Sequence, residues 1–272
     1  MIAPVALALA DAEVRFGGKA VSLGKSLRAG LPVPPGFALD VEAVDEIARG
    51  RVSPAVLRDL LKDLGGRAAV RSSAIGEDAK DVSFAGQHLT ILNVTSVDSL
   101  VHAIHEVHQS AHSASALSYR ERMKISGPPR IAVAIQHLVH ADSAGVLFTR
   151  NPATGASERL IEAAWGLGET VVSGAVVPDS YRLSPDGELL ETSIGQKDIA
   201  LCISAEGGTV EVAIEPSRIH AQVLSDSELV QLHRLTLRCE EVFGDGLDIE
   251  WAFESGELYL LQCRSITRVR SA

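Results

Sequence analysis

Four polar residues near the end of the 272-residue sequence are spaced as a metal and phosphate site would need them. Asp248 and Glu250 are two apart in one strand-like run, and Gln262 and Arg264 are two apart in the next. Residues two apart on a strand share a face, and directly opposite residues of an antiparallel pair share it too. A hairpin pairing Glu250 with Gln262 and Asp248 with Arg264 would therefore gather all four on one face.

That register also predicts the rest of the hairpin. It leaves a three-residue loop, 255–257, in which Gly256 is free to take a positive φ. It assigns the other face to apolar side chains, namely Ile249, Trp251, Phe253, Tyr259, Leu261 and Cys263. Two carboxylates and an amide oxygen beside an arginine suit Mg²⁺ shared with phosphate oxygens. A solvent-facing sheet surface with a salt bridge is the alternative, and periodicity does not distinguish the two.

A second group of residues suits phosphate binding. The strand-like run 68–72 delivers Arg71 into a loop of small and acidic residues that includes 83–87. A guanidinium and loop N–H groups are suited to phosphate, although Ser, Gly and Asp are also ordinary turn formers. Residues 17–19 (Gly-Gly-Lys) resemble a phosphate-binding turn but lack the P-loop spacing, and 165–169 lack the dinucleotide-binding fingerprint.

The elements that must position these residues fall into two parts. Helical patterns and one strand precede a break at 126–129, where Ser-Gly-Pro-Pro interrupts the chain. After the break we expect strands at 131–135, 145–149, 159–163 and 176–183, a helix at 227–243 between Ser225-Asp226 and Gly244, and the hairpin. This order predicts an α+β or α/β chain with lobes at 1–129 and 130–272 and a ligand cleft between them.

Composition narrows the function classes. The formal charge of -10 argues against nucleic acid or an anionic membrane as the main partner, because both select for dense Lys and Arg. Apart from a short apolar run at the start, no stretch approaches the roughly 20 apolar residues of a membrane-spanning helix. Cys202, Cys239 and Cys263 form no CxxC or zinc pattern, so we expect a cytoplasmic protein.

Taken together, these segments resemble a known family, and nearly the whole chain is covered in the family's order. The resemblance is to the N-terminal nucleotide-binding domain of pyruvate phosphate dikinase, phosphoenolpyruvate synthase and rifampicin phosphotransferase. The matching blocks are Gly17-Gly18-Lys19, 30–37 (GLPVPPGF), 70–73 (VRSS), Glu77-Asp78, 83–87 (SFAGQ), 145–149 (GVLFT), 165–169 (WGLGE), Pro178-Asp179, 248–251 (DIEW) and 261–264 (LQCR).

The resemblance implies an ATP-grasp fold of the α+β class, with ATP held between two lobes. In the first lobe, Lys19 and Arg71 would neutralise the phosphates. The residues of the covering loop would be Ser83, Gly86 and Gln87. After the lobe boundary, Gln136 and Leu138 would border the adenine.

In the second lobe, the resemblance implies that Glu169 would bind the ribose. Glu250 and Gln262 would ligate Mg²⁺ with Asp248 nearby, and Arg264 would contact the transferring phosphates. These roles agree with phosphoryl transfer, which needs positioning and charge neutralisation more than covalent help from the protein.

The sequence also departs from the family. Large members carry a swivelling domain with a phosphorylatable histidine and then a substrate domain, and the Thr-Ser-His segment of the former does not occur here. The stretch between Phe37 and Arg71 is also shorter than the family leads us to expect. We therefore expect a stand-alone Mg-ATP-dependent component that transfers a pyrophosphoryl or phosphoryl group to a histidine on a separate carrier protein, with a separate substrate-domain protein. Direct phosphorylation of a small molecule and a non-catalytic ATP-binding regulatory module are the alternatives.

Four histidines form one further pattern. His102, His105, His108 and His112 are spaced to line one stripe of a helix. We expect a solvated helix face, since no carboxylate or carbonyl partners that metal-ligating histidines require are identifiable. A metal site or an alternative phospho-acceptor is the other interpretation.

Overall fold

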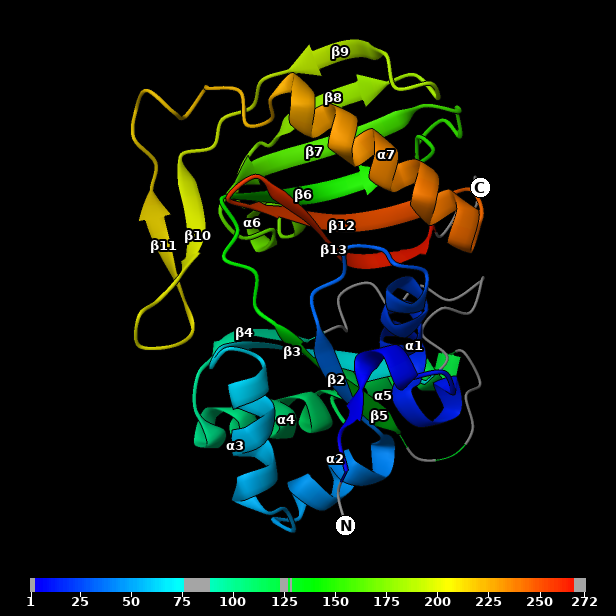
Figure 1. Ribbon diagram of the computed structural model, residues 1–272, viewed down its shortest axis with the longest axis vertical. Helices are drawn as coiled ribbons and strands as arrows, with labels where there is room; N and C mark the ends of the chain where they lie inside the picture. Colours follow the sequence, from blue (N-terminus) through cyan, green and yellow to red (C-terminus); the bar gives the residue numbers. More distant parts are fainter. Residues whose placement is uncertain (1–2, 76–88, 123–126, 128, 267–272) are drawn as a thin grey trace. The chain divides into compact units, whose positions relative to one another are not determined.

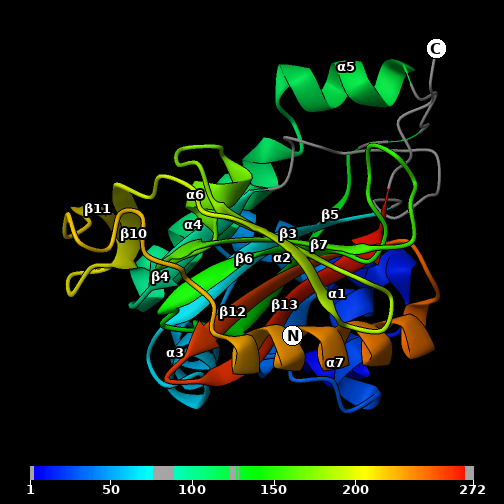
Figure 2. The ribbon, with the colours of Figure 1, turned by 90° about the horizontal axis from the view of Figure 1, so that it is seen from above.

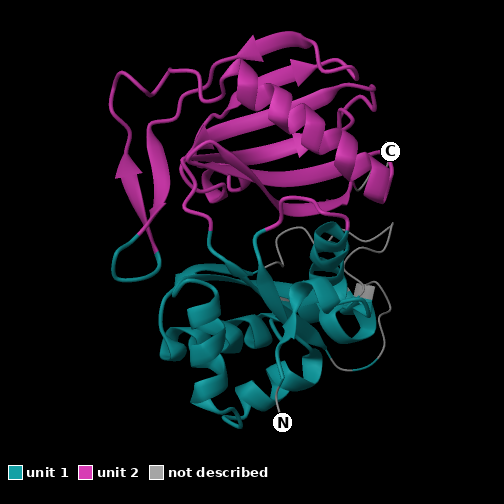
Figure 3. Cartoon of the chain, viewed as in Figure 1, with its two compact units in different colours: residues 1–28, 34–138, 204–208 teal, residues 29–33, 139–203, 209–272 magenta. Residues whose placement is uncertain are grey.

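The computed structural model describes residues 3–75, 89–122, 127 and 129–266. The chain forms two compact units (Figure 3). Unit 1 contains residues 1–28, 34–138 and 204–208, and unit 2 contains 29–33, 139–203 and 209–272. The units are therefore interleaved in sequence, with short segments of each embedded in the other's stretch of chain.

Unit 1 is built on an antiparallel five-stranded sheet (Figure 1). Its strand order is β1 (Val5–Ala6), β2 (Gly36–Leu39), β5 (Ile131–His137), β3 (Ala68–Ala74) and β4 (Thr90–Val94). Its helices are η1 (Leu7–Leu9), α1 (Glu13–Arg28), α2 (Val41–Ala48), α3 (Pro54–Asp63), α4 (Val97–Ser110) and α5 (Ala114–Arg122).

Side-chain alternation in β3 divides unit 1 into an apolar and a polar layer. Ala68 and Val70 join the main core cluster with side chains of α2, α3 and α4. Arg71 and Ser73 have the opposite parity, and Ser73 contacts α1, where its Oγ accepts a hydrogen bond from Ala20 N (3.0 Å). The sheet thus separates a hydrophobic core from a buried polar layer under α1.

Two short embedded segments are held by hydrogen bonds within their units. In unit 1, Asn93 takes a left-handed conformation (φ 56°), and its Nδ2 donates to the carbonyls of Ser204 (2.7 Å) and Gly208 (2.6 Å). In unit 2, Leu260 N donates to Pro32 O (2.9 Å). Each segment therefore satisfies backbone or side-chain groups that belong to its own unit.

Unit 2 is built on an antiparallel six-stranded sheet. Its strand order is β13 (Glu257–Ser265), β12 (Leu247–Glu254), β6 (Ser143–Phe148), β7 (Arg159–Trp165), β8 (Asp179–Leu183) and β9 (Leu189–Ser193). The unit also contains the antiparallel pair β10 (Ile199–Ile203) and β11 (Thr209–Ala213), and the helices α6 (Glu169–Val172) and α7 (Asp226–Phe243).

Helix α7 covers one face of this sheet (Figure 1, Figure 2). It begins with a capping box formed by Ser225 and Glu228 and ends at Gly244 (φ 86°), which confirms the predicted limits of the helix. The covered face is mainly apolar, and on it the Arg159 guanidinium pairs with Glu240 of α7 at 2.8 Å. The opposite face of the sheet is therefore the one that carries the polar residues predicted to bind ligands.

The predicted hairpin forms with one correction. Asp248 pairs with Arg264 and Glu250 with Gln262, as expected. Beyond Glu250 the register shifts, because Leu261 is an extra residue on β13 and the turn contains only Ser255 (φ 51°) and Gly256 (φ 82°). The predicted three-residue loop is thus wrong: a two-residue turn plus a bulge uses the same length of chain.

The bulge changes which side chains share the apolar face. Leu258 and Leu260 lie opposite Phe253 and Trp251 in place of the predicted Tyr259 and Leu261, whereas Cys263 lies opposite Ile249 as expected.

The predicted boundary between two lobes after residue 129 stays a prediction. The compact units change instead at 138/139, because β5 pairs with β2 and β3 and so belongs to unit 1. In the described part of the chain, none of the helices combines the length and apolarity needed to cross a bilayer.

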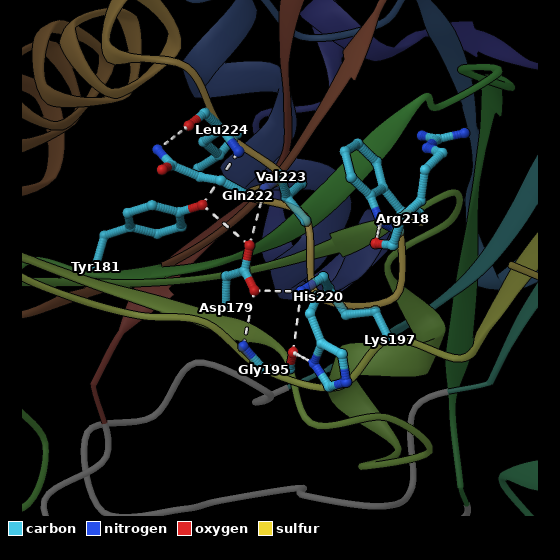
Figure 4. A network of polar contacts seen from close by, with 10 residues as sticks. Asp179, Tyr181, Gly195, Lys197, Arg218, His220, Gln222, Val223 and Leu224 are labelled. Atoms are coloured by element: carbon cyan, nitrogen blue, oxygen red, sulfur yellow. Dashed lines mark hydrogen bonds and ion pairs between the residues drawn. The ribbon is translucent and has the colours of Figure 1, made fainter. Parts of the chain in front are cut away.

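A buried ion pair joins three segments of unit 2 (Figure 4). Asp179, at the start of β8, and Lys197 are both fully buried and paired. The Asp179 carboxylate also accepts hydrogen bonds from Gly195 N (2.9 Å), Val223 N (2.8 Å) and the Tyr181 hydroxyl (3.2 Å). Burial raises the pKa of Tyr181, so its hydroxyl stays protonated and donates to Asp179.

Removing one charge of this pair is expected to destabilise the fold. We predict that Asp179→Asn lowers the free energy of unfolding by about 3–5 kcal/mol, because it leaves the Lys197 ammonium buried without its counter-charge. The double variant Asp179→Asn/Lys197→Met should lose less than the sum of the two single losses. Denaturant unfolding measures both, and Asp186→Asn in the exposed β8–β9 turn is the matched control, with a change below about 0.5 kcal/mol. An unfolding curve of Asp179→Asn that matches the parent would refute a stabilising role.

Candidate nucleotide and metal site

The polar face of unit 2 contains a row of side chains set by strand pairing. Gln262 lies opposite Glu250, Glu250 opposite Val146 on β6, and Val146 opposite Glu162 on β7. Directly paired residues share a face, so Gln262, Glu250 and Glu162 project to the same side of the sheet. The structure therefore places Glu250 and Gln262 opposite each other as predicted and adds a second carboxylate, that of Glu162, to their row.

An ion pair lies next to this row. The Nε and one terminal nitrogen of Arg264 both lie 2.8 Å from Oδ2 of Asp248. Asp248 is mostly buried, whereas Arg264 is 39% exposed and so remains accessible to an anion. The salt bridge that the alternative interpretation expected is therefore present, and it orients the guanidinium at the edge of the predicted metal ligands.

The electrostatics of Asp248 reflect its two charged neighbours. Burial raises the pKa of this carboxyl; the positive charge and hydrogen bond of Arg264 oppose the rise, and the negative charge of Glu250 adds to it. A bound cation would relieve the repulsion between the two carboxylates. Glu250, Gln262 and Asp248 offer only oxygen ligands, the type that Mg²⁺ prefers, and therefore fit this ion.

In unit 1, the two predicted phosphate-binding cations lie on the α1 side of the sheet. Lys19 and Arg71 are 4% and 6% exposed. Gly17 and Ala20 of α1 both lie close to Ser73 of β3. The helix segment that carries Lys19 therefore lies over this part of β3, and Arg71 is two residues before Ser73 on the strand. An ammonium and a guanidinium are groups that bind phosphate, so the two side chains suit the predicted role.

The close approach of α1 to β3 depends on Gly17. This residue interrupts α1 with φ 74° and ψ 167°, a conformation restricted almost entirely to glycine. A Cβ atom here would lie 2.1 Å from Ser73 O. Gly17 therefore allows the helix to start directly against the strand, which places Lys19 in the polar layer.

The structure also shows where the residues predicted to bind the adenine and the ribose lie. Gln136 is buried near the end of β5, where its Nε2 donates to Pro34 O (3.4 Å), and Leu138 is buried just beyond the strand. In unit 2, Glu169 is the first residue of α6. These nucleotide roles stay predictions. The predicted loop residues Ser83, Gly86 and Gln87 lie outside the described residues.

The histidine stripe lies on α4 with carboxylates beside it. His102 Nε2 lies 2.9 Å from Glu106, and His108 Nε2 lies 3.2 Å from Asp45. His112 Nδ1 contacts His108 O (3.0 Å). Within the described ranges, no group of three or more His, Cys, Asp or Glu side chains is arranged to hold a metal ion. His102 and His112 are exposed, whereas His105 and His108 are half-buried, so the role of the stripe stays a prediction.

One residue of the polar face was missed from the sequence. Glu162 is the single charged residue inside the apolar stretch 160–165 (LIEAAW) of β7. Burial raises the pKa of its carboxyl. An acidic residue in an otherwise apolar strand was the available signal, but sequence alone does not identify which strand pairs with β7.

Comparisons with known proteins identify the family. Residues 55–272 match the family model described as "Pyruvate phosphate dikinase, AMP/ATP-binding domain". The chain is 33% identical over 304 residues to a probable phosphoenolpyruvate synthase of Methanothermobacter thermautotrophicus, covering 94% of this chain and 44% of that protein. It is 37% identical over 282 residues to the prodigiosin synthesizing transferase PigC of Serratia marcescens, covering 93% of this chain and 32% of that protein. Among solved structures, D-alanine–D-alanine ligase from Bacillus anthracis matches with a TM-score of 0.42 and 12% identity, over 93% of this chain and 58% of that one.

The chain belongs to the family of pyruvate phosphate dikinase AMP/ATP-binding domains. The resemblance expected from the sequence motifs is thereby confirmed, and the helices and antiparallel sheets are of the expected α+β class. The chain spans less than half the length of these two curated relatives. It therefore corresponds to one domain of each of those larger proteins.

The role of Gly17 is open to a direct test. We predict that Gly17→Ala destabilises unit 1 by at least about 2 kcal/mol more than Gly50→Ala, because overpacking against rigid backbone adds to the cost of a positive φ. Gly50 is the matched control, since its φ is 71° and a Cβ there would meet nothing within 4 Å. Chemical unfolding of the two variants gives the comparison, and equal losses would show that the approach to Ser73 imposes no constraint.

Proposed function

We propose that this chain binds Mg-ATP and transfers a phosphoryl or pyrophosphoryl group to a histidine on a carrier outside these 272 residues. The observation that carries the proposal is the paired set Asp248–Arg264 and Glu250–Gln262 on one face of unit 2. Membership in an AMP/ATP-binding domain family supports the nucleotide. The set supplies oxygen ligands for a cation and a guanidinium for phosphate, which are the groups that phosphoryl transfer requires.

Each side chain has a separate role in this proposal. Glu250 and Gln262 hold Mg²⁺ with Asp248 nearby, and the ion, when bound, neutralises charge on the phosphate oxygens. Arg264 contacts the transferring phosphates from the position that Asp248 gives it. Lys19 and Arg71 of unit 1 neutralise the remaining phosphate charge.

The acceptor determines which nucleotide is released. Attack of an imidazole nitrogen on the β-phosphorus breaks the bond to the α-phosphate oxygen and releases AMP, with pyrophosphate on the histidine. Attack on the γ-phosphorus releases ADP instead. The longer relatives, one of them a probable phosphoenolpyruvate synthase, support an acceptor located elsewhere in the system.

The first test identifies the product. Incubated with ATP, Mg²⁺ and a histidine-carrier domain of a phosphoenolpyruvate synthase-like protein, the chain is expected to release AMP or ADP and leave the carrier phosphorylated at an acid-labile phosphohistidine. Chromatography of nucleotides and mass spectrometry of the carrier provide the readouts. ADP formed with a small molecule and no carrier would favour a direct kinase, and tight ATP binding without turnover under any pairing would favour a regulatory module.

The second test separates the ligands. Glu250→Gln should weaken ATP binding tenfold or more in Mg²⁺ and leave metal-free binding nearly unchanged, because it removes a charged metal ligand. Lys19→Ala and Arg71→Ala should each lower turnover by about 100-fold, since each removes a charge directed at the phosphates.

Matched controls are available on the same elements. Glu254→Gln lies on β12, and Lys25→Ala lies on the exposed side of α1, so neither should change binding or turnover. Calorimetry with and without Mg²⁺ and steady-state kinetics measure the effects. Parent affinity for ATP that is equal with and without Mg²⁺ would remove the metal role of Glu250, and near-parent turnover of Lys19→Ala or Arg71→Ala would refute those assignments.

A further inference from the structure

The hydroxyl of Thr149, a fully buried residue directly after β6, lies at the start of β12. Its Oγ1 accepts hydrogen bonds from two consecutive backbone groups, Gly246 N (3.1 Å) and Leu247 N (2.9 Å). The backbone N of Thr149 in turn donates to Leu247 O (2.9 Å). Thr149 and Leu247 are therefore joined in both directions at the point where β12 begins.

The Thr149 hydroxyl has the place that a backbone carbonyl has in a regular ladder. Phe148 lies opposite Asp248, so Leu247 is the next residue opposite Thr149. In a hydrogen-bonded antiparallel pair, each carbonyl accepts from the N–H of the other residue. Here the Thr149 carbonyl accepts from Arg159 (2.6 Å), and the hydroxyl accepts the Leu247 N–H. A side chain without an oxygen would leave that buried N–H without this acceptor, which is costly.

The groups around this junction are themselves held in place. Arg159 is buried and pairs with Glu240 of α7 at 2.8 Å, so its bond to the Thr149 carbonyl comes from an anchored side chain. On the opposite side, Gly246 O accepts from Ile266 N (2.7 Å), directly after β13. The start of β12 is thus fixed to the ends of both neighbouring strands.

The ion pair of the candidate site follows this junction at once. Asp248 is the next residue after Leu247, and its Oδ2 accepts from Nε and a terminal nitrogen of Arg264, both at 2.8 Å. A carboxylate that binds two nitrogens of a guanidinium also fixes its orientation. A shift at the start of β12 would move the Asp248 carboxylate first and the guanidinium with it. Glu250 lies further along the strand, beyond the fully buried Ile249.

We propose that Thr149 is a positioning residue for phosphoryl transfer: its hydroxyl fixes the start of β12, so that Asp248 directs the Arg264 guanidinium at the transferring phosphates. This inference rests on the proposed function and adds a residue that acts through Asp248. Its effect falls on the rate of transfer more than on nucleotide affinity, because Arg264 contacts the groups in transfer whereas Glu250 holds the ion.

The test is Thr149→Val, which keeps the β-branched shape and removes the acceptor oxygen. With ATP, Mg²⁺ and the histidine-carrier domain, this variant should lower kcat about tenfold or more and change the KM for ATP by less than about threefold, since misplacement of a positioned group costs rate. Thr149→Ser keeps the hydroxyl and should retain kcat within about threefold of the parent. If Thr149→Val does not fold, Thr149→Cys replaces it, with a smaller loss of kcat because sulfur is a weaker acceptor.

The matched control is Thr236→Val. Thr236 is also fully buried, and its Oγ1 donates to Leu232 O (2.9 Å) within α7. The control removes a buried hydroxyl from the same unit without touching the start of β12, so its kcat should equal that of the parent. Each rate is divided by the folded fraction from an unfolding curve. An unchanged kcat in Thr149→Val, or an equal loss in Thr236→Val, would overturn the role of Thr149.

A double-variant cycle tests the route through Asp248. Asp248→Asn alone should lower kcat, and Thr149→Val added to it should lower kcat by less than about threefold further, because both changes remove the same orientation of Arg264. Two losses that multiply in full would overturn this route. A parent that does not turn over ATP with the carrier would overturn the proposed function and this role together, whereas an active parent with an equally active Thr149→Val would overturn this role alone.

Discussion

The register of β12 against its neighbours is the constraint on which the polar face of unit 2 depends. Side chains alternate along a strand, so a slip of one residue would turn Asp248 and Glu250 toward α7 and bring Ile249 to the ligand side. The buried Ile249, Trp251 and Phe253 make such a slip costly, because they fill the core beneath α7. The hydrophobic core thus fixes the positions of polar groups that contribute little to stability themselves.

Unit 1 positions its cations by a different means. Its polar layer depends on small side chains, since Ala134 lies opposite Arg71 on β5 and Ala38 lies opposite Ala134 on β2. Together with Gly17, these residues leave room under α1 for long charged side chains. Lys19 and Arg71 are consequently held by the packing of helix on sheet rather than by a flexible loop, which reduces the entropy lost on binding an anion.

Sequence patterns predicted the features that depend on local rules. The capping residues Ser225 and Gly244 set the limits of α7, and alternation gave the pairing of Glu250 with Gln262. The bulge at Leu261 was missed because two turn geometries fit the same length of chain. The Asp179–Lys197 pair and the place of Glu162 depend on segments that meet only in the folded sheet, and no local pattern encodes which strands become neighbours.

The interleaving of the two units bears on how such a domain is inherited. Asn93 needs the carbonyls of residues 204–208 as partners, and Leu260 needs the carbonyl of Pro32. A genetic crossover near residue 138 would separate each unit from its embedded segment. The buried polar groups that these segments satisfy would then lose their hydrogen-bond partners. Transfer of either unit alone would therefore break these hydrogen bonds, whereas transfer of the whole domain would keep them.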